Sequence, residues 1–342
     1  MKYIFLSLIT VFSFTILHAQ LPSEKHLSNL KQLTFGGQNA EAYFSFDDTK
    51  LVFQSQRDSL QCDQIFTMNL DGSDVRLISN GKGRTTCSYF MPDGEHILYA
   101  STHLGSETCP PVPDRKKGYV WGLYPTYDIF VSDTKGNITG RLTNTPGYDA
   151  EAVVSPTGDK IVFTSIRNGD LDIYTMNLDG SNVKQLTNTL GYDGGPFFSA
   201  DGKKIVYRAY YPKTEQEIKE YKELLAEEKI KPIKLQIWMM NTDGTDKVQI
   251  TDNNGTNFAP FMHPDGKRII FASNMDDTSK VPMNFDLYLI NTDKTRLERI
   301  TFGDTFDGFP MFTRDGKKLV FASNRNAKER HETNVFISDW KP

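Results

Sequence analysis

The sequence predicts an all-β protein, a six-bladed β-propeller of four-stranded antiparallel blades that is closed by its N-terminal strand and carries a short helical insertion in blade four. Three observations lead to this prediction. A strand motif recurs six times, Asp-Gly turns flank it, and one longer stretch is nearly duplicated, as FTMNLDGSDVRLIS at residues 66–79 and YTMNLDGSNVKQLTN at residues 174–188.

The recurring strand motif is apolar at consecutive positions rather than at alternating ones, which indicates burial on both faces of a sheet. Strands of this kind need a neighbouring sheet on each side, so the motif is expected to form the second strand of each blade. Its six copies are KLVFQS from Lys50, HILYAS from His96, KIVFTS from Lys160, KIVYRA from Lys204, RIIFAS from Arg268 and KLVFAS from Lys318.

Asp-Gly pairs mark tight turns on both sides of these strands, because glycine adopts positive φ without a Cβ clash. Each unit then holds four strands over about 44 to 50 residues outside its insertions. A ring of such units leaves few exposed strand edges and is favoured over a sandwich. The pairs precede the second strands at 93–94, 201–202, 265–266 and 315–316 and follow the third strands at 71–72, 179–180 and 243–244.

The last unit stops after its third strand, at residues 334–339, and residues 30–34 match the missing fourth strand. We therefore expect the N-terminal strand to close the ring. Insertions are expected at about 104–124 in blade two and 212–233 in blade four. Both fall between the second and third strands of their blades, so they share one face, where we expect the function to lie.

The two insertions differ in composition. The first carries Tyr119, Trp121 and Tyr124 among prolines, which predicts either an aromatic lid or rings packed on the blade tops. The second reads as an amphipathic helix, since Thr214 and Glu217 form a capping box ahead of an apolar face. That helix is expected to rest on the rim or to recruit a partner.

Residues 1–20 are expected to be a signal peptide. Lys2 precedes an apolar stretch from Ile4 to Leu17, and residues 18–20 read as a cleavage region. The stretch is too short for a membrane span. The expected organisation is a signal peptide followed by a propeller at 21–342, periplasmic or secreted and monomeric. The formal charge of −4 gives no reason to expect a nucleic-acid partner.

The chain contains three cysteines, Cys62, Cys87 and Cys109, an odd number for an oxidising compartment. The expected topology places all three toward the insertion-bearing face. We predict a disulfide through Cys109 that ties down the blade-two insertion, with Cys87 or Cys62 as its partner.

The stretches GYDAEAVVSPTGDKIVFTS and IYTMNLDGSNVKQLTN resemble the propeller repeats of the TolB family, the periplasmic component of the Tol-Pal envelope system. The resemblance covers nearly the whole chain after the leader and implies the propeller fold. The same repeat class includes bare scaffolds, accessory propellers on peptidases and oligogalacturonate lyases. TolB itself carries an α/β domain ahead of its propeller, for which this chain leaves only about ten residues, so we expect a TolB-like protein without that domain.

Candidate binding residues lie where the innermost strands begin, around the mouth of the expected channel. Counting nine residues back from each first-turn position reaches six polar residues: Asn39, Thr85, Asp149, Asp193, Asn257 and Asp307. They either bind a charged ligand or hold loops through backbone hydrogen bonds. With neighbouring positions, the candidate ligand-binding residues are Asn39, Glu41, Arg84, Tyr148, Asp149, Glu151, Tyr192, Asp193, Asn257, Asp307 and Arg325.

The sequence predicts no catalytic residue, no cofactor and no metal ligand set. It contains no Gly-x-Ser-x-Gly elbow, and His331-Glu332 lacks the second histidine of a zinc protease helix. Asn168, Asp170 and Asp172 alternate through one loop and offer oxygen ligands to calcium, but without the full loop pattern.

These observations favour an exported, non-catalytic propeller that binds an envelope protein or peptide through its insertion-bearing face. One alternative is an enzyme acting on acidic oligosaccharides, like the oligogalacturonate lyases of the repeat class, through Asp149, Glu151 and Asp193. A second alternative is an accessory propeller for a peptidase.

Overall fold

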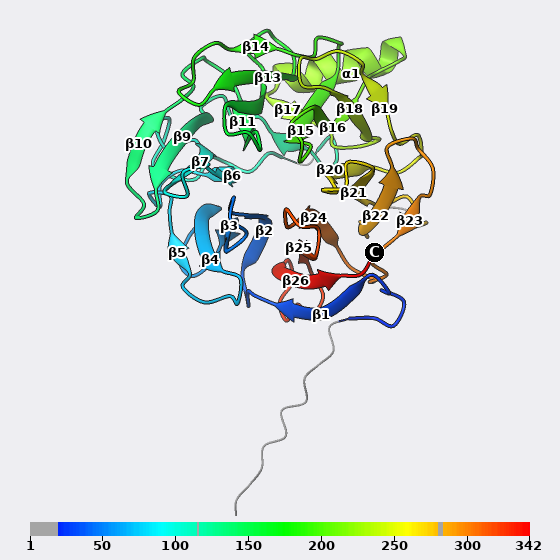
Figure 1. Cartoon of the computed structure of the whole chain (residues 1–342). Coiled ribbons are helices and arrows are strands. Elements are labelled where there is room, and N and C mark those ends of the chain that lie inside the picture. The colour runs from blue at the N-terminus through cyan, green and yellow to red at the C-terminus, as the bar shows by residue number, and fades with distance from the viewer. Residues whose placement is uncertain (1–19, 115, 280–282) are drawn as a thin grey trace, which may run out of the picture.

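Six four-stranded antiparallel sheets surround a central axis in the computed structural model, which describes residues 20–114, 116–279 and 283–342 (Figure 1). One α-helix is present in these ranges, inside blade four. The predicted six-bladed propeller is therefore confirmed. The expected signal peptide at 1–20 lies outside the described residues except for Gln20.

Each blade runs from an inner strand near the axis to an outer strand at the rim (Figure 1). The strands of blades one to three are β2 (Gln38–Phe44), β3 (Lys50–Gln56), β4 (Gln64–Asn69) and β5 (Arg76–Leu77); β6 (Thr85–Phe90), β7 (His96–Ser101), β9 (Asp128–Asp133) and β10 (Ile138–Arg141); β11 (Asp149–Val154), β12 (Lys160–Ser165), β13 (Asp172–Asn177) and β14 (Lys184–Gln185).

The other three blades follow the same order, and β1 is the outer strand of blade six. Their strands are β15 (Tyr192–Phe198), β16 (Lys204–Tyr210), β18 (Gln236–Asn241) and β19 (Val248–Gln249); β20 (Asn257–Met262), β21 (Arg268–Ser273), β22 (Asp286–Asn291) and β23 (Glu298–Arg299); β24 (Asp307–Phe312), β25 (Lys318–Ser323), β26 (Asn334–Trp340) and β1 (Leu27–Gln32).

The second strands form the centre of the core. Phe53, Phe163 and Tyr207 lie at the same position of the motif in three blades and have no exposed surface. A blade packed between two neighbours buries both of its faces, which explains why these strands are apolar at consecutive positions. The turns that lead into them are set by residues such as Asp93, whose carboxylate accepts the backbone N–H groups of Glu95 and His96 at 2.9 and 3.0 Å.

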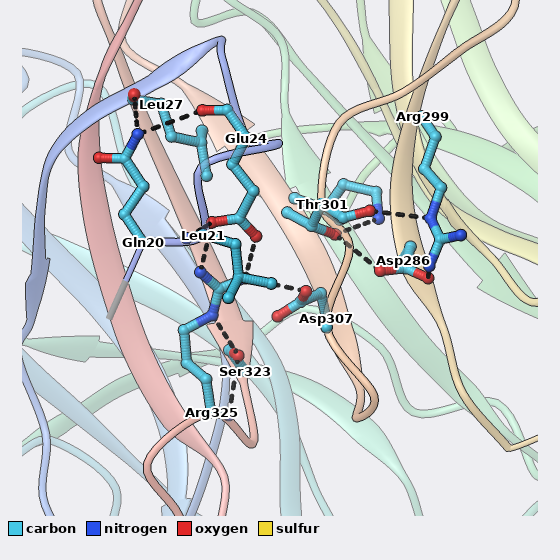
Figure 2. Close-up of polar contacts among 12 residues, drawn as sticks. Gln20, Leu21, Glu24, Leu27, Asp286, Arg299, Thr301, Asp307, Ser323 and Arg325 are labelled. Atoms are coloured by element: carbon cyan, nitrogen blue, oxygen red, sulfur yellow. Dashed lines mark hydrogen bonds and ion pairs between the residues drawn. The ribbon is translucent and has the colours of Figure 1, made fainter. Parts of the chain in front are cut away.

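The Leu-Thr or Ile-Thr pair that ends five of the six repeats has a structural purpose. In blade five, the hydroxyl of Thr301 accepts the backbone N–H of Leu287 at 2.9 Å, and Arg299 donates to Asp286 at 2.6 Å (Figure 2). Blade two repeats this arrangement, with Arg141 donating to Asp128 at 2.6 Å. These contacts fasten the short outer strand to the third strand, since two ladder residues alone hold it weakly.

The ring closes by pairing β1 with β26, as predicted. An ionic cluster strengthens the closure just before β1 (Figure 2). Glu24 is fully buried and receives both terminal nitrogens of Arg325, at 3.1 and 3.0 Å. Arg325 also donates to Asp307 at 2.9 Å, so the N-terminal segment is bound to the inner strand of its blade. This cluster was not predicted from the sequence.

Both insertions emerge between second and third strands, as predicted, and they meet. Their two-residue strands β8 (Trp121–Gly122) and β17 (Lys229–Ile230) form a small antiparallel sheet. The helix α1 (Glu215–Ala226) begins with the predicted capping box between Thr214 and Glu217. Tyr221 on its buried face donates a hydrogen bond to the carbonyl of Gly191 at 2.6 Å. The helix therefore packs on the propeller rim.

Cys62 and Cys109 form a disulfide, and Cys87 is free. The structure pairs Cys109 with Cys62, one of the two partners that the sequence left open. Because Cys62 lies just before the third strand of blade one, the bond fastens the blade-two insertion to its neighbour. In the ranges that the structure covers, no helix is both long and apolar enough to cross a bilayer.

Candidate functional site

A β-bulge occurs at the same position of every inner strand. In each blade the register of the inner strand shifts two residues after its first polar residue, and the residue there has left-handed or closely related backbone geometry, with φ of 52° at Glu41 and 57° at Glu151. The six bulged residues form a ring, which we call the bulge ring: Glu41, Cys87, Glu151, Gly195, Ala259 and Phe309.

All six residues of the bulge ring line one cavity of about 1360 Å³. The ring is not uniform, because blades one to three contribute two carboxylates and a thiol, whereas blades four to six contribute glycine, alanine and phenylalanine. The cavity therefore has a polar side and an apolar side at the same depth.

Aromatic side chains close the channel below the cavity. The rings of Tyr43 and Phe197 have centroids 5.1 Å apart, and Phe197 also contacts Tyr89 and Phe261 at 6.3 and 5.7 Å. Blade one faces blade four in a six-membered ring, so the Tyr43–Phe197 contact crosses the axis. Tyr43 and Phe197 line the cavity, and Tyr89 and Phe261 pack against Phe197; we call these four side chains the floor.

The two insertions cover part of the cavity from above. Tyr119, Trp121 and Tyr124 of the first insertion and Ile230 and Ile233 of the second line it. The rings of the first insertion differ in their surroundings. Trp121 packs on the blade tops, 6.5 Å from the ring of Tyr192, while Tyr119 remains 49% exposed. We call this cover the roof.

A buried ion pair lies at the centre of the polar side. Arg208, 6% exposed, donates to Glu151, and its Nε donates to the hydroxyl of Tyr192 at 2.9 Å. Its guanidinium also lies 5.3 and 5.4 Å from the ring centres of Trp121 and Tyr192. Burial opposes its charge, but Glu151 and the tyrosine raise the pKa of Arg208 above its usual value.

Glu151 has further partners, and Gly195 makes room for them. The second carboxylate oxygen of Glu151 accepts the hydroxyl of Thr164 at 2.7 Å and the backbone N–H of Gly195 at 2.8 Å. A Cβ atom at position 195 would come within 2.0 Å of Arg208 Nη1. Glycine is thus required here for the space that the guanidinium occupies, since the other five bulged residues adopt a similar φ without being glycine.

Glu41, in the equivalent position of blade one, is in a different environment. Its carboxyl lies beside the thiol of Cys87, and burial raises its pKa to about 7. Burial and the nearby carboxylates of Glu41 and Glu151 raise the pKa of the Cys87 thiol as well. Cys87 is thereby held as a neutral thiol, which makes it a weak nucleophile.

The apolar side consists of phenylalanines from blades five and six. The ring of Phe258 lies 5.1 Å from Phe285, 6.2 Å from Phe306 and 5.4 Å from Phe309. All four line the cavity. We call this group the phenylalanine wall; it offers a surface on which an apolar group can pack.

The lining carries an excess of acidic groups. Five carboxylates face three basic side chains, and two of the bases are paired within the lining, Arg208 with Glu151 and Arg84 with Asp63 at 2.7 Å. The acidic residues are Glu41, Asp63, Glu151, Asp277 and Asp304, and the basic ones are Arg84, Arg208 and Lys234.

The predicted binding residues fall into two groups. Five of them, Glu41, Arg84, Tyr148, Glu151 and Tyr192, line the cavity. The others lie behind the bulge ring and hold neighbouring segments. Those contacts are Asn39 to the carbonyl of Thr333 at 2.8 Å, Asp149 with Arg167 at 3.1 Å, Asp193 from Tyr211 at 2.6 Å, Asn257 to the carbonyl of Leu235 at 3.0 Å, and Asp307 with Arg325.

The contacts of this second group are those expected if these polar residues hold loops through hydrogen bonds. Burial raises the pKa of Asp193 to about 8, although Tyr211 donates to it. The residues that sequence reasoning missed are Cys87 as a ring member, Arg208 as the central cation and the phenylalanine wall. The signal for the bulge ring was a constant offset of two residues from the predicted polar set.

The candidate calcium ligands are engaged in contacts within the protein. Asp170 accepts the hydroxyl of Tyr221 and the backbone N–H of Gly191, the latter at 3.0 Å. Asp172 accepts the side chains of Thr187 and Gln185 at 3.0 and 2.9 Å. These contacts join the loop to helix α1 and to the outer strand. No cluster of three or more metal-ligating side chains occurs among the residues placed by the structure.

Comparison with known proteins identifies the fold. The sequence profile of the TolB beta propeller domain matches residues 124–231. A TolB candidate from Agrobacterium tumefaciens superposes with a TM-score of 0.57 at 17% identity, covering 92% of this chain and 97% of that one. TolB from Acinetobacter baumannii superposes with the same TM-score and identity over 90% of this chain, which spans only 64% of the length of that protein.

An oligogalacturonate lyase from Vibrio parahaemolyticus is also similar, with a TM-score of 0.53 at 13% identity over 91% of this chain and 93% of the lyase. Identities this low show a shared fold. They do not show whether the chain binds a ligand or catalyses a reaction, and the geometry of the cavity is the basis for that choice.

Proposed function

Because this chain is a TolB-like six-bladed β-propeller, we propose that it is an exported, non-catalytic binding protein of the bacterial envelope. It receives a segment of another protein, or a peptide, in the cavity on its insertion-bearing face. The observation that carries this proposal is the cavity itself, large enough for several side chains and lined by the phenylalanine wall and the bulge ring.

The shape of the cavity supports a short segment as ligand. The floor of Tyr43, Tyr89, Phe197 and Phe261 blocks passage, and the roof covers one side of the mouth. A loop tip or a chain end fits such a space, whereas a continuous strand passing through the ring does not.

The charge of the lining weighs against an acidic oligosaccharide as ligand. An acidic sugar would meet five carboxylates, and both cavity arginines are already paired with Asp63 and Glu151. Like charges at short range are repulsive in a partly desolvated site. We therefore favour the binding of a peptide over the lyase alternative.

Selection from a random peptide library on the purified protein tests this proposal. The selected peptides should lose affinity by tenfold or more for Phe306→Ala, because that ring is part of the phenylalanine wall. The matched control is Val183→Ala, an exposed residue in a blade turn outside the cavity lining. Peptides that bind Phe306→Ala as well as they bind the unchanged protein would place their site elsewhere and contradict the proposal.

Export is tested separately. N-terminal sequencing of the protein recovered from the periplasm of an expressing cell should show a chain that starts near residue 20 or 21. A full-length chain that stays in the cytoplasm would contradict the export part of the proposal.

A further inference from the structure

Two glutamates occupy equivalent positions of the bulge ring, but only one has a cationic partner. Glu151 receives the guanidinium of Arg208 together with the hydroxyl of Thr164 and the N–H of Gly195. For Glu41, no lysine or arginine within the described ranges is close enough to form an ion pair; its carboxyl faces the Cys87 thiol. The fold thus places a glutamate at this position in two blades, and only Glu151 forms an ion pair with a basic side chain of the described residues.

The satisfied glutamate shows which chemistry the position accepts. At Glu151 the partner is a planar cation held between a carboxylate and the rings of Trp121 and Tyr192. Glu41 is also next to aromatic surface. In the ring it follows Phe309 of the adjacent blade six, and Tyr43 of its own strand lies in the floor beneath it. A cation with an apolar body would therefore find a carboxylate and aromatic rings together.

The remaining charges near Glu41 do not replace such a partner. Arg84 is paired with Asp63, and Arg208 with Glu151. Lys234, the third base of the lining, is 64% exposed in its side chain and lies 3.4 Å from Glu217 of helix α1. The excess negative charge of the lining thus lies on Glu41, Asp277 and Asp304, for which the described residues supply no ion pair.

We propose that Glu41 binds an ammonium or guanidinium group whose apolar body packs on the phenylalanine wall. This inference rests on the proposed function, since a basic side chain of a bound peptide supplies this chemistry, but a free apolar amine supplies it equally. The cation enters beside Cys87 and gives Glu41 the ionic contact that Arg208 gives Glu151. Removal of the Glu41 charge should therefore weaken the binding of cationic ligands and leave the binding of neutral apolar ligands unchanged.

Cys87 reports on this site directly. The chain has three cysteines and two form the disulfide, so Cys87 is the one free thiol. The test compares the rates at which Cys87 reacts with two methanethiosulfonates, a cationic trimethylammonium-ethyl reagent and an anionic sulfonato-ethyl reagent. Each rate is divided by the rate of the same reagent with 2-mercaptoethanol, a small thiol in free solution. We expect the cationic reagent to be favoured by at least tenfold.

Glu41→Gln should reduce this preference several-fold, because the change removes the carboxylate beside Cys87 and keeps the shape. Glu95→Gln, an exposed residue in a turn on the opposite face, is the matched control and should leave the preference unchanged. An equal ratio in the unchanged protein and in Glu41→Gln would overturn the proposal.

Calorimetry with the mature chain distinguishes the sources of the cation. The small probes are 4-phenylbutylamine, 4-phenylbutanol and 4-phenylbutyrate, which share one apolar body. The peptide probes are those selected from the library, each compared with a version in which lysine or arginine is replaced by glutamine. We expect the cationic member of each set to bind about tenfold more tightly than the neutral one, and Glu41→Gln to abolish the difference.

The outcomes separate this inference from the proposed function. Binding of the amine without binding of any peptide supports the cation site and rejects the peptide function. Peptides that bind equally with and without their basic residue, together with an amine no better than the alcohol, keep the function and overturn the cation site. Absence of binding in both sets, with no charge preference at Cys87, overturns both.

Discussion

Arginines pair with several of the buried carboxylates of this protein. Arg208 neutralises Glu151 in the cavity, and Arg325 joins Glu24 to Asp307 where the ring closes. A buried carboxylate without its partner is strongly unfavourable, whereas an exposed pair contributes little. The location of an ion pair therefore decides its effect on stability.

Glu24→Gln should lower the free energy of unfolding by about 3 kcal/mol, because Arg325 keeps Asp307 but loses its fully buried partner. Denaturant unfolding measures the change. The control is Glu298→Gln, which removes an exposed pair with Lys25 from the same region and should alter stability by less than about 1 kcal/mol. Equal effects of the two substitutions would contradict the importance of burial at Glu24.

Glu41 should make stability depend on pH. Its pKa of about 7 in the folded protein exceeds the usual 4.5, so the folded state binds more protons than the unfolded state between these values. The free energy of unfolding therefore falls as pH rises through this window, by about 1–3 kcal/mol from this group. The neighbouring charges are Glu151 and Asp63, which raise the pKa, and Arg208, which lowers it.

Denaturant unfolding at pH 5 and pH 8.5 tests this. Glu41→Gln should show a smaller loss of stability between the two values than the unchanged protein, while Glu95→Gln should show the same loss. An identical difference in all three proteins would refute the assignment of this pH dependence to Glu41.

At the scale of elements, repeat strands and turns were predictable and the bulges were not. Consecutive apolar residues and Asp-Gly pairs reflect local requirements that a sequence displays. A residue at positive φ is signalled by glycine, and only Gly195 among the six bulged residues is one. Glu41 and Cys87 adopt this conformation because the surrounding blade imposes it, so their residue types give no sign of it and only their offset from the polar set marks them.

The pairing of the two insertions through β8 and β17 could not be predicted from the sequence either. Strands β8 and β17 are two residues long and lie in segments more than a hundred residues apart, too short for an alternating pattern. The amphipathic helix and the disulfide through Cys109 were predictable because each rests on a residue-type signal, a capping box in one case and a cysteine in the other. The choice of Cys62 over Cys87 required the structure.

Loss of the disulfide should loosen the roof. Cys109→Ser removes a cross-link between residues 47 apart, which should lower the free energy of unfolding by about 2–4 kcal/mol. It should also speed tryptic cleavage after Lys116 or Lys117, both exposed in the first insertion. Melting curves and timed digestion measure the two effects. Cys87→Ala, which leaves the disulfide intact, should show no faster cleavage, and equal digestion of both variants would contradict this role.

At the scale of the whole molecule, the number of blades and the closure of the ring followed from counting repeats and finding the missing strand at the other end of the chain. The ionic cluster at Glu24 could not be read in the same way, because it joins residues 301 positions apart and no repeat unit contains it. Long-range pairs of single residues leave no periodic pattern.

Removal of β1 should open the ring. A chain that starts at residue 34 leaves β26 as an exposed edge strand, which favours pairing with other chains. We expect such a protein to form aggregates in size-exclusion chromatography and to lose its single cooperative melting transition. A monomer that melts like the chain with β1 would show that the pairing of β1 with β26 is dispensable.

The aromatic floor has a kinetic consequence. A partner that enters this propeller reaches a dead end at Tyr43 and Phe197 and has to withdraw along the path by which it came. The β8–β17 ribbon covers one side of the mouth, so entry and exit share the part of the mouth that it leaves open.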